Sequence, residues 1–363
     1  MGRTLLVTGG CGFIGSAVIR RLIRHSDHVV VNVDKMTYAA SEDALEEARL
    51  DRRYLHVRAD IADAAAMRAV FASHRPDAVM HLAAESHVDR SIDGPADFIT
   101  SNIVGTFILL EAAREYWAAL DPAAKAAFRF HHISTDEVFG ALGPSDPPFT
   151  EATPYDPRSP YSASKAASDH LVRAWRHTYD LPTLVSNTTN NYGPWQFPEK
   201  LIPLVTLNAL EGRELPVYGD GSNQRDWIFV DDHAEALVGV VERGEPGATY
   251  AIGARQPRSN LEVVRAICAH LDRRQPDPAG PRARLIRFVT DRPGHDFRYE
   301  IDASRAQAAL GWQAAHDFDA GLARTIDWYL DHRAWWQALR AARYDGARLG
   351  TAPGAGKTGR SAA

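Results

Sequence analysis

Acid, base and hydroxyl side chains stand close together in two groups near the middle of the chain. Thr135, Asp136 and Glu137 follow one another, and Tyr161 and Lys165 come four residues apart further on. Residues four apart share one face of a helix, where an ammonium can lower the pKa of a phenol. A phenolate so placed can take a hydroxyl proton while hydride leaves the carbon, and two carboxylates can donate and remove protons in an elimination. The spacing predicts an oxidation coupled to loss of water.

Each of these residues also has a plainer interpretation. Tyr and Lys four residues apart arise by chance on exposed helices, and Asp followed by Glu at a strand end can be a polar turn in solvent. Here the two carboxylates directly follow Thr135, and Tyr161 lies downstream of them. Ionisable groups gathered in this way are typical of functional sites. We therefore favour catalytic roles over a solvated turn.

A glycine-rich turn lies near the start of the chain. Gly9, Gly12 and Gly15 separate a short aliphatic run from an amphipathic one. Glycines at this spacing let the backbone turn tightly and approach a pyrophosphate at a helix N-terminus. Asp34 stands nineteen residues after Gly15, at the end of the next predicted strand. Its carboxylate can bind the adenosine ribose and would repel a 2′-phosphate, so the pattern favours NAD over NADP, with a solvated strand end as the alternative.

The elements that must position these residues alternate along the first half of the chain. Short β-branched runs and longer amphipathic runs follow one another, which indicates βαβ units and a parallel sheet. Asp60 and Ile61 follow the third predicted strand and are candidates for holding the adenine edge. The predicted strands are Leu5–Thr8, Val29–Asp34, Tyr54–Arg58, Ala78–Leu82, Phe130–Ser134 and Thr183–Thr188, and the predicted helices include Ile14–Arg24, Ala62–Ser73, Phe98–Tyr116 and Pro160–Tyr179.

The alternation fades after Asn190 into loops rich in Pro, Gly and Asp. Shorter helices are predicted at Leu201–Glu211, Asp231–Arg243, Asn260–Arg273 and Asp317–Leu330. We expect an α/β protein with a Rossmann-type doubly wound parallel sheet over residues 1–188. A smaller mixed α/β lobe over 189–341 would bind substrate, with some segments returning to the first domain. Residues 342–363 have little to bury, which predicts a disordered tail.

Composition excludes several classes of function. The formal net charge of −5 and the lack of a Lys/Arg-rich run argue against nucleic-acid binding. No uninterrupted apolar run approaches the roughly 20 residues of a membrane span, and the apolar N-terminal run is too short for a signal peptide. Cys11 and Cys268 are too few for a disulfide framework, which predicts a cytoplasmic protein. His131 and His132 point to opposite faces of a strand, so we predict no metal site.

The chain resembles the extended short-chain dehydrogenase/reductase family, and within it the dTDP-glucose 4,6-dehydratase branch, from Thr4 to about Leu330. Two small departures are Phe139, where relatives usually carry Tyr, and Thr188-Thr189, which replaces a common Cys-Ser. The stretches that carry the resemblance are His81–Asp89, Ser134–Gly140, Asn190–Pro194, Pro198–Pro203 and Asp291–Asp296.

The resemblance implies a role for each matching residue. Thr135 and Tyr161 would contact the hexose 4-hydroxyl, with Asp136 as the acid and Glu137 as the base. NAD would be held by Gly9, Gly12, Phe13, Ile14, Gly15, Asp34, Lys35, Met36, Thr37, Asp60, Ile61, Leu82, Ala83, Ala84, Glu85, Ser101, Tyr161, Lys165 and Asn191. The nucleotide sugar would be received by Ser86, Thr135, Asn190, Lys200, Leu201, Pro216, Val217, Tyr218, Arg225, Asn260, Asp291, Arg292, Pro293, Gly294 and His295. A homodimer through two helices per subunit is also implied.

The implied reaction is dehydration of dTDP-glucose to dTDP-4-keto-6-deoxy-glucose, in deoxysugar biosynthesis such as that of dTDP-rhamnose. Oxidation at C4 would acidify the C5 hydrogen, water would leave across C5 and C6, and hydride would return to C6. The alternatives are a nucleotide-sugar 4-epimerase, a 4,6-dehydratase of another NDP-hexose, and a non-catalytic NAD-binding scaffold. Asp136 and Glu137 argue against an epimerase, which needs no elimination. For Arg225, a diphosphate contact competes with a salt bridge to Asp226 or Asp231.

Overall fold

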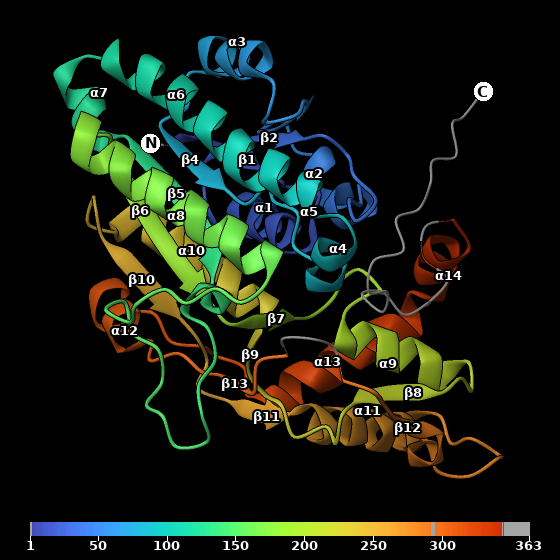
Figure 1. Ribbon diagram of the computed structural model, residues 1–363. Coiled ribbons are helices and arrows are strands. Elements are labelled where there is room, and N and C mark those ends of the chain that lie inside the picture. Colours follow the sequence, from blue (N-terminus) through green and yellow to red (C-terminus); the bar gives the residue numbers. More distant parts are fainter. Residues whose placement is uncertain (1, 292–294, 343, 345–363) are drawn as a thin grey trace, which may run out of the picture.

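A parallel sheet with helices on both faces forms the larger part of the protein (Figure 1). The computed structural model describes residues 2–291, 295–342 and 344. The sheet has seven strands in the order β10-β6-β5-β4-β1-β2-β3, and all of its pairs are parallel. This confirms the predicted Rossmann-type fold. The strands are β1 (Thr4–Thr8), β2 (Val29–Asp34), β3 (Tyr54–Arg58), β4 (Ala78–His81), β5 (Arg129–Thr135), β6 (Thr183–Thr188) and β10 (Thr249–Ile252).

Successive residues of the central strands point into different layers of the core. Leu5 and Val7 of β1 join the cluster that includes residues of α1 and α10, whereas Leu6 joins the cluster on the other face. This is the pattern of a strand buried on both sides, which carries a continuous run of aliphatic residues. The covering helices are α1 (Phe13–His25), α10 (Val230–Arg243) and α12 (Ser304–Leu310) on one face, and α3 (Ala64–His74), α6 (Gly105–Ala118) and α8 (Pro160–Tyr179) on the other.

The predicted helix Phe98–Tyr116 is part of a longer one. A short helix α5 (Pro95–Phe98), a π-helical segment η2 (Ile99–Val104) and α6 run on as a single helix from Pro95 to Ala118. By length and composition alone it is apolar enough to cross a membrane, which no run in the sequence led us to expect. However, half of its most apolar window is buried inside the protein, and α6 packs against α3 and α8. That is the environment of a core helix.

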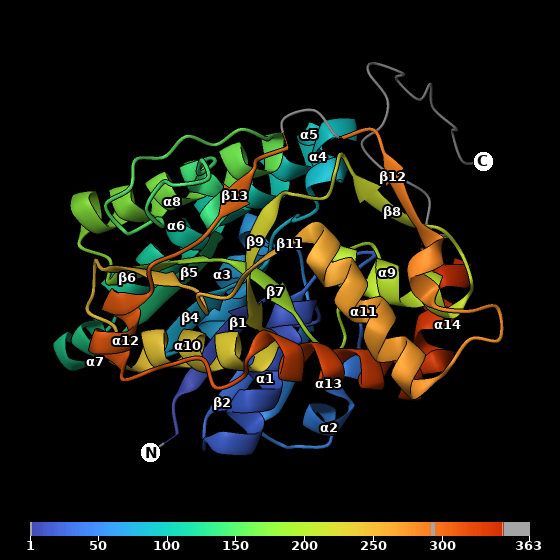
Figure 2. The same cartoon turned by 90° about the horizontal axis from the view of Figure 1, so that it is seen from below.

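The second half of the chain builds a smaller part, which lies below the large sheet in Figure 1 and is seen from below in Figure 2. Its core consists of aliphatic and aromatic residues from its own strands and helices. It contains a four-stranded sheet and a separate strand pair: β7 (Asn190–Tyr192), β9 (Gln224–Phe229), β11 (Pro257–Ser259) and β13 (Arg298–Tyr299) form the sheet, and β8 (Leu215–Tyr218) pairs with β12 (Ile286–Val289). Its helices are α9 (Leu201–Leu210), α11 (Asn260–Arg274), α13 (Phe318–Asp331) and α14 (Arg333–Ala342). The remaining short elements are η1 (Asp43–Leu45), α2 (Glu46–Arg49), α4 (Val88–Asp93), α7 (Pro122–Ala127), η3 (Asp136–Phe139) and η4 (Arg282–Leu285).

One strand of the large sheet comes from the second half of the chain. β10 pairs in parallel with β6, so that Thr249 lies opposite Val185 and Ile252 opposite Thr188. No strand was predicted at these residues from the sequence. The helix before β10, α10, packs against α1, and α12 packs against α10 and β10. The chain therefore leaves the large sheet after β6, builds strands of the smaller part and then returns.

Four histidines are buried in and around the large sheet. His81, His131, His132 and His233 are each at most 1% exposed. Burial lowers the pKa of His131 and His233 to about 3 and that of His132 to about 4, and it holds the pKa of His81 well below its usual range. All are neutral at pH 7. Among residues 2–291, 295–342 and 344, no group of three or more His, Cys, Asp or Glu is arranged to hold a metal ion.

We expect these histidines to make the protein sensitive to acid. In the unfolded chain a histidine takes up a proton below about pH 6.5, whereas in the folded protein it does not, so stability falls as the pH falls. Asp136 and Asp226 act in the opposite direction, because burial raises their pKa values and the folded state binds their protons first. The net fall between pH 6.5 and 5 should be about 1–3 kcal/mol per pH unit, measured by urea unfolding. His131→Gln should reduce this slope by about 1.4 kcal/mol per unit, and an unchanged slope would contradict the assignment.

Candidate active site

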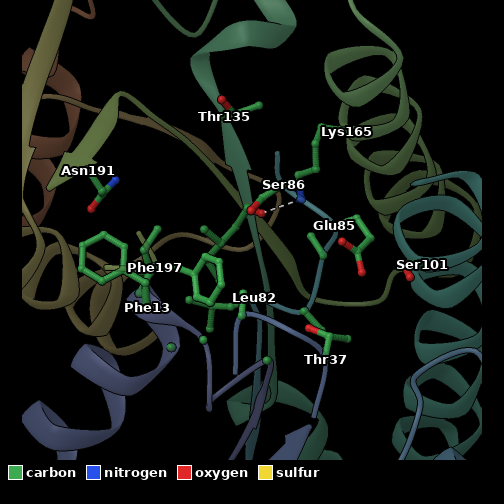
Figure 3. Close-up of a pocket in the computed structure, with 18 of the residues that line it drawn as sticks. Phe13, Thr37, Leu82, Glu85, Ser86, Ser101, Thr135, Lys165, Asn191 and Phe197 are labelled. Atoms are coloured by element: carbon green, nitrogen blue, oxygen red, sulfur yellow. Dashed lines mark hydrogen bonds between the residues drawn. The ribbon is translucent and has the colours of Figure 1, made fainter. Parts of the chain in front are cut away.

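A cavity of about 310 Å³ opens where several parallel strands of the large sheet end (Figure 3). This edge of a doubly wound sheet is the usual place for a ligand. Thr135 reaches the cavity from the end of β5 and Lys165 reaches it from α8. The predicted residues that line it are Gly9, Gly12, Phe13, Ile14, Gly15, Asp34, Lys35, Thr37, Ile61, Leu82, Ala83, Ala84, Glu85, Ser86, Ser101, Thr135, Asp136, Glu137, Tyr161, Lys165, Asn190, Asn191 and Lys200.

The glycine-rich turn at the cavity leaves no room for side chains. Gly9 has a φ of +70°, and a Cβ there would lie 2.7 Å from the backbone of Ala83. A Cβ on Gly15 would lie 2.2 Å from the carbonyl oxygen of Gly9. The N-terminus of α1 begins beside this turn, and Gly12 provides no side-chain cap for its amides. Amides of this kind suit a pyrophosphate, so the turn fits the dinucleotide that the sequence predicted.

Substituting Gly15 should disrupt this turn. Gly15→Ala forces backbone atoms apart, which we expect to lower the free energy of unfolding by about 1–3 kcal/mol and to weaken NAD binding. Gly94→Ala is the matched control, because a Cβ on Gly94 meets nothing closer than 4.0 Å. Thermal unfolding and titration with NAD would measure both effects. A Gly15→Ala protein that binds NAD as tightly as the wild type would contradict the prediction.

Asp34 is fixed at the mouth of the cavity by backbone amides. Its side chain accepts a hydrogen bond from the Cys11 amide at 3.0 Å and another from the Met36 amide at 2.8 Å. Asp34 is 8% exposed and lines the cavity, whereas Met36 does not. A carboxylate oxygen has more than one acceptor site, so Asp34 can still bind a hydroxyl. Burial and Asp34 raise the pKa of the Cys11 thiol to about 12, so this thiol is a packing group.

Lys35, Asp60 and Ser101 form a polar edge beside the cavity. The Lys35 ammonium donates to Ser101 Oγ at 3.0 Å and lies 3.5 Å from Asp60 Oδ2. The other Asp60 oxygen accepts the Ala62 amide at 2.9 Å. Asp60 itself does not line the cavity, although its neighbour Ile61 does. The structure therefore places Asp60 where it orients Lys35 and the following turn.

The predicted acid lies at the end of β5, in the short η3 turn. Thr135 Oγ1 accepts the Glu137 amide at 3.2 Å and donates to Asp136 Oδ1 at 3.3 Å. Asp136 is 1% exposed, and its Oδ2 has no hydrogen-bond partner in the described part of the chain. Burial, and then the neighbouring Glu137, raise the pKa of Asp136 well above its usual range. Asp136 can therefore hold a proton at neutral pH and donate it.

Tyr161 and Lys165 both come from the start of α8. This helix begins firmly, because Ser159 and Ser162 form a reciprocal capping box. We had predicted that the Lys165 ammonium lowers the pKa of the Tyr161 phenol, and this prediction was wrong. Burial and the charge of Glu137 raise the pKa of Tyr161, and a hydrogen bond with Thr135 lowers it. The Lys165 ammonium instead donates to the carbonyl oxygen of Ile133 at 2.8 Å, and burial lowers its pKa to about 8.

The residues predicted to bind the nucleotide sugar fall into separate groups. Ser86, Asn190 and Lys200 line the cavity, and Lys200 Nζ donates to the carbonyl oxygen of Ser86 at 2.9 Å. The others lie outside the cavity lining in the smaller part: Leu201, Pro216, Val217, Tyr218, Arg225, Asn260, Asp291 and His295. Arg292, Pro293 and Gly294 lie outside the described residues, as does most of the predicted tail.

Arg225 and His295 have well-defined surroundings in the smaller part. The Arg225 guanidinium donates to the carbonyl oxygen of Asp296 at 3.1 Å and lies 4.3 Å from the centre of the Tyr299 ring. Its charge also lowers the pKa of Asp136, so the two side chains are near neighbours. His295 Nδ1 lies 2.7 Å from Asp291 Oδ1. Arg225 thus joins the 296–299 segment to the edge of the cavity.

Several residues that line the cavity were not predicted from the sequence. Glu199 is held by two residues of the larger part: the Tyr38 hydroxyl donates to Oε1 and Arg90 Nε donates to Oε2, both at 2.9 Å. Glu199 lies between Pro198 and Lys200, within the Pro198–Pro203 stretch that carries the family resemblance, and this position could have identified it as a site residue. The unpredicted lining residues are Val33, Ala39, Ala40, Ala59, Ile133, Ser134, Thr188, Thr189, Gln196, Phe197, Glu199 and His233.

Known proteins resemble this chain over nearly its full length. Residues 6–325 match the family described as GDP-mannose 4,6 dehydratase. A dTDP-glucose 4,6-dehydratase from Escherichia coli is 57% identical over 357 residues, which cover 95% of this chain and 99% of the relative. The structure of a dTDP-glucose 4,6-dehydratase from Streptomyces venezuelae with NAD bound has a TM-score of 0.84 and 39% identity, covering 93% of this chain and 99% of that one. The enzyme of the same name from Bacillus anthracis, in complex with NAD, has a TM-score of 0.83 and 36% identity, covering 93% and 100%.

Proposed function

The chain belongs to the GDP-mannose 4,6 dehydratase family, and from this premise we propose that it dehydrates dTDP-glucose to dTDP-4-keto-6-deoxy-glucose with NAD as its cofactor. The observation that carries the proposal is a buried Asp136, its pKa raised by burial and by Glu137, in the cavity that Glu137 and Tyr161 also line. An acid and a base in one closed site are what an elimination requires. The product serves deoxysugar biosynthesis.

Three side chains, those of Tyr161, Glu137 and Asp136, transfer protons to or from the hexose. Thr135 is hydrogen-bonded to Tyr161 and binds the oxygen of the 4-hydroxyl. This hydrogen bond lowers the pKa of the phenol, and the positive charge of bound NAD would lower it further, so that Tyr161 accepts the proton of the 4-hydroxyl. NAD, which the Gly9–Gly15 turn and Asp34 would hold, would supply hydride transfer from C4 to C6. Glu137 removes the C5 proton, Asp136 protonates the C6 hydroxyl as it leaves as water, and a proton returns to C5 when C6 becomes a methyl group. The turn at Gly9 and Gly15 and the carboxylate of Asp34 support NAD as the dinucleotide, because a fixed anion repels a 2′-phosphate.

The remaining residue assignments are also part of this proposal. Residues 1–188 hold mainly the cofactor, and residues 189–341 bind mainly the nucleotide sugar, with β10 and its neighbouring helices returning to the first domain. Ser86, Asn190 and Lys200 receive the sugar diphosphate together with Arg225, whose guanidinium suits phosphate oxygens. Tyr218 and Asn260 are further residues that receive the nucleotide sugar.

Product analysis after incubation with nucleotide sugars tests the function. dTDP-glucose, UDP-glucose, GDP-glucose and CDP-glucose are supplied separately, and the products are identified by mass and by the ultraviolet absorbance of the keto sugar. We expect loss of water from dTDP-glucose at the highest kcat/KM. Conversion of dTDP-glucose to dTDP-galactose would replace dehydration with 4-epimerisation. Bound NAD without turnover of any of the four sugars would indicate a binding scaffold.

We propose that two copies associate through α6 and α8, which lie side by side on the surface (Figure 1). Ile99 and Phe107 are 47% and 44% exposed, and Tyr179 on α8 is 42% exposed. Trp175 bridges Phe107 and Tyr179, with ring centres 5.9 and 5.6 Å apart, so the apolar surface is continuous. Light scattering should give twice the mass of one chain, and Phe107→Glu should reduce the measured mass to that of one chain.

We also propose that the enzyme works in the cytoplasm. Its two cysteines are free thiols, which stay reduced there, and its nucleotide-sugar substrate suits that compartment.

A further inference from the structure

A buried carboxylate, Asp169, lies next to the catalytic pair and has no role in the chemistry proposed above. Tyr161, Lys165 and Asp169 follow one another at intervals of four residues on α8, so they share one helical face. The side chain of Asp169 is 0% exposed. An ionised carboxylate in such a place is costly unless it is paired and hydrogen-bonded. The side chains that contact Asp169 therefore indicate the role of its negative charge.

The contacts of Asp169 lead directly to Lys165. Asp169 Oδ2 accepts the Tyr155 hydroxyl at 2.8 Å and the Asn187 amide at 3.0 Å. Asp169 Oδ1 lies 3.1 Å from His132 Nε2, and the same nitrogen lies 3.5 Å from the Lys165 ammonium. The same ring nitrogen, His132 Nε2, thus lies near both the Asp169 carboxylate and the Lys165 ammonium.

The charges of this group follow from its surroundings. Despite its burial, the pKa of Asp169 is lowered by His132 and Lys165, so it is an anion. The pKa of His132 is lowered to about 4 by burial and by Lys165, so the ring is neutral at pH 7. Nε2 of the neutral ring faces both groups, so it can donate to Asp169 or accept from Lys165, but not both at once. The group therefore contains one anion, one neutral imidazole and one cation.

Other ionisable groups pack against this arrangement. The Arg173 guanidinium donates to the Tyr155 hydroxyl at 2.8 Å, which places a second cation two contacts away from Asp169. The His81 ring centre lies 5.2 Å from that of His132, and His81 is neutral. The groups that face Lys165 or Asp169 from the packed elements are His81 on β4, His132 on β5, Tyr155 ahead of α8, and Tyr161, His170 and Arg173 on α8. Asp169 is the anion among them whose charge favours the ammonium form of Lys165.

We propose that Asp169 is a positioning residue whose charge, acting across His132, keeps Lys165 in its ammonium form and directed at the carbonyl oxygen of Ile133. Burial alone disfavours the charged lysine, and Asp169 opposes this effect. Asp169 touches neither the cavity nor the reacting atoms. Its influence on catalysis is therefore exerted through neighbouring side chains: its charge favours the ammonium form of Lys165 and also raises the pKa of Tyr161.

Asp169→Asn tests the proposal, because it removes the charge and nearly keeps the shape. The protein is labelled with ¹³C at lysine Cε, and the pKa of Lys165 is followed by NMR. The chain has few lysines to assign, namely Lys35, Lys125, Lys165, Lys200 and Lys357. We expect the pKa of Lys165 to fall from about 8 by about one unit or more in the variant. Tyr155→Phe removes a hydrogen bond but keeps the anion, so it should leave the Lys165 titration near that of the wild type.

The turnover measurement rests on the proposed function, whereas the NMR titration does not. With dTDP-glucose, the alkaline limb of the kcat profile should shift to lower pH by the same amount as the Lys165 pKa, with KM little changed. An unchanged Lys165 titration in Asp169→Asn overturns the proposal even if activity falls. A shifted titration on a protein that does not dehydrate dTDP-glucose refutes only the proposed function. Should Asp169→Asn fail to fold, Asp169→Glu displaces the charge instead, and an unchanged Lys165 pKa there would also overturn the proposal.

Discussion

Replacing Asp136 with Asn should lower the rate of dTDP-4-keto-6-deoxy-glucose formation by about 10²–10⁴-fold, the usual contribution of a general acid. Asp136 is buried and its pKa is raised by burial and by Glu137, which suits the proposed role of donating a proton to the leaving hydroxyl. An amide has nearly the same shape but cannot give up a proton in this way. Binding of dTDP, measured by calorimetry, should change little.

A deuterium experiment separates Asp136 from its neighbour. In D₂O, Asp136→Asn should still exchange the C5 hydrogen of dTDP-glucose for deuterium, because Tyr161 and Glu137 remain. Glu137→Gln is the matched variant, and it should lose both exchange and dehydration. Mass spectrometry of the recovered substrate measures the exchange. If Asp136→Asn forms product at nearly the wild-type rate, or if it loses C5 exchange along with product, the assignment of Asp136 as the acid is wrong.

Tyr161→Phe should abolish both the exchange of the C5 hydrogen and the dehydration, with a fall in turnover of about 10²–10⁴-fold. The phenol is hydrogen-bonded to Thr135 in the cavity, and we propose it as the group that accepts the proton of the 4-hydroxyl. Without that transfer C4 remains an alcohol, so the C5 hydrogen stays inert and no deuterium enters. This pattern differs from that of Asp136→Asn, in which exchange continues.

A second buried tyrosine provides the control for this variant. The Tyr192 hydroxyl donates to the carbonyl oxygen of Phe318 at 3.2 Å in the core of the smaller part, and the residue is 1% exposed. Tyr192→Phe removes a buried hydroxyl away from the cavity, so it should lower stability by about 1 kcal/mol and leave turnover nearly intact. Equal losses of turnover in Tyr161→Phe and Tyr192→Phe would indicate a structural role for Tyr161.

Local patterns were enough to predict most of the large sheet. The bounds of β2, Val29–Asp34, are those predicted, because aliphatic residues and a terminal Asp mark the strand clearly. β10 was missed because it is four residues long and is defined by its pairing with β6, which no local period reports. The helix around η2 was predicted too short because its π-helical turn departs from the regular helical period.

The spacing of chemical groups located the candidate site but not its electrostatics. Residues 161 and 165 do share a helical face, as predicted. The direction of the Tyr161 pKa shift was wrong, because it depends on burial and on carboxylates from another element. The Lys165 ammonium is also drawn to the Ile133 carbonyl, a contact between α8 and β5 that a helical repeat cannot reveal. The role of Glu199 between two parts of the chain was equally beyond local patterns.

The separation of β6 and β10 in the sequence affects how the protein folds during its synthesis. During synthesis β6 leaves the ribosome well before its partner strand, so the nascent chain carries an unpaired strand edge for as long as the intervening residues are translated. Open edges of this kind recruit strands from other chains. We expect a fragment that stops at residue 188 to aggregate, whereas one that continues through Ile252 can complete the sheet. A split version of the enzyme would therefore have to be cut after that strand.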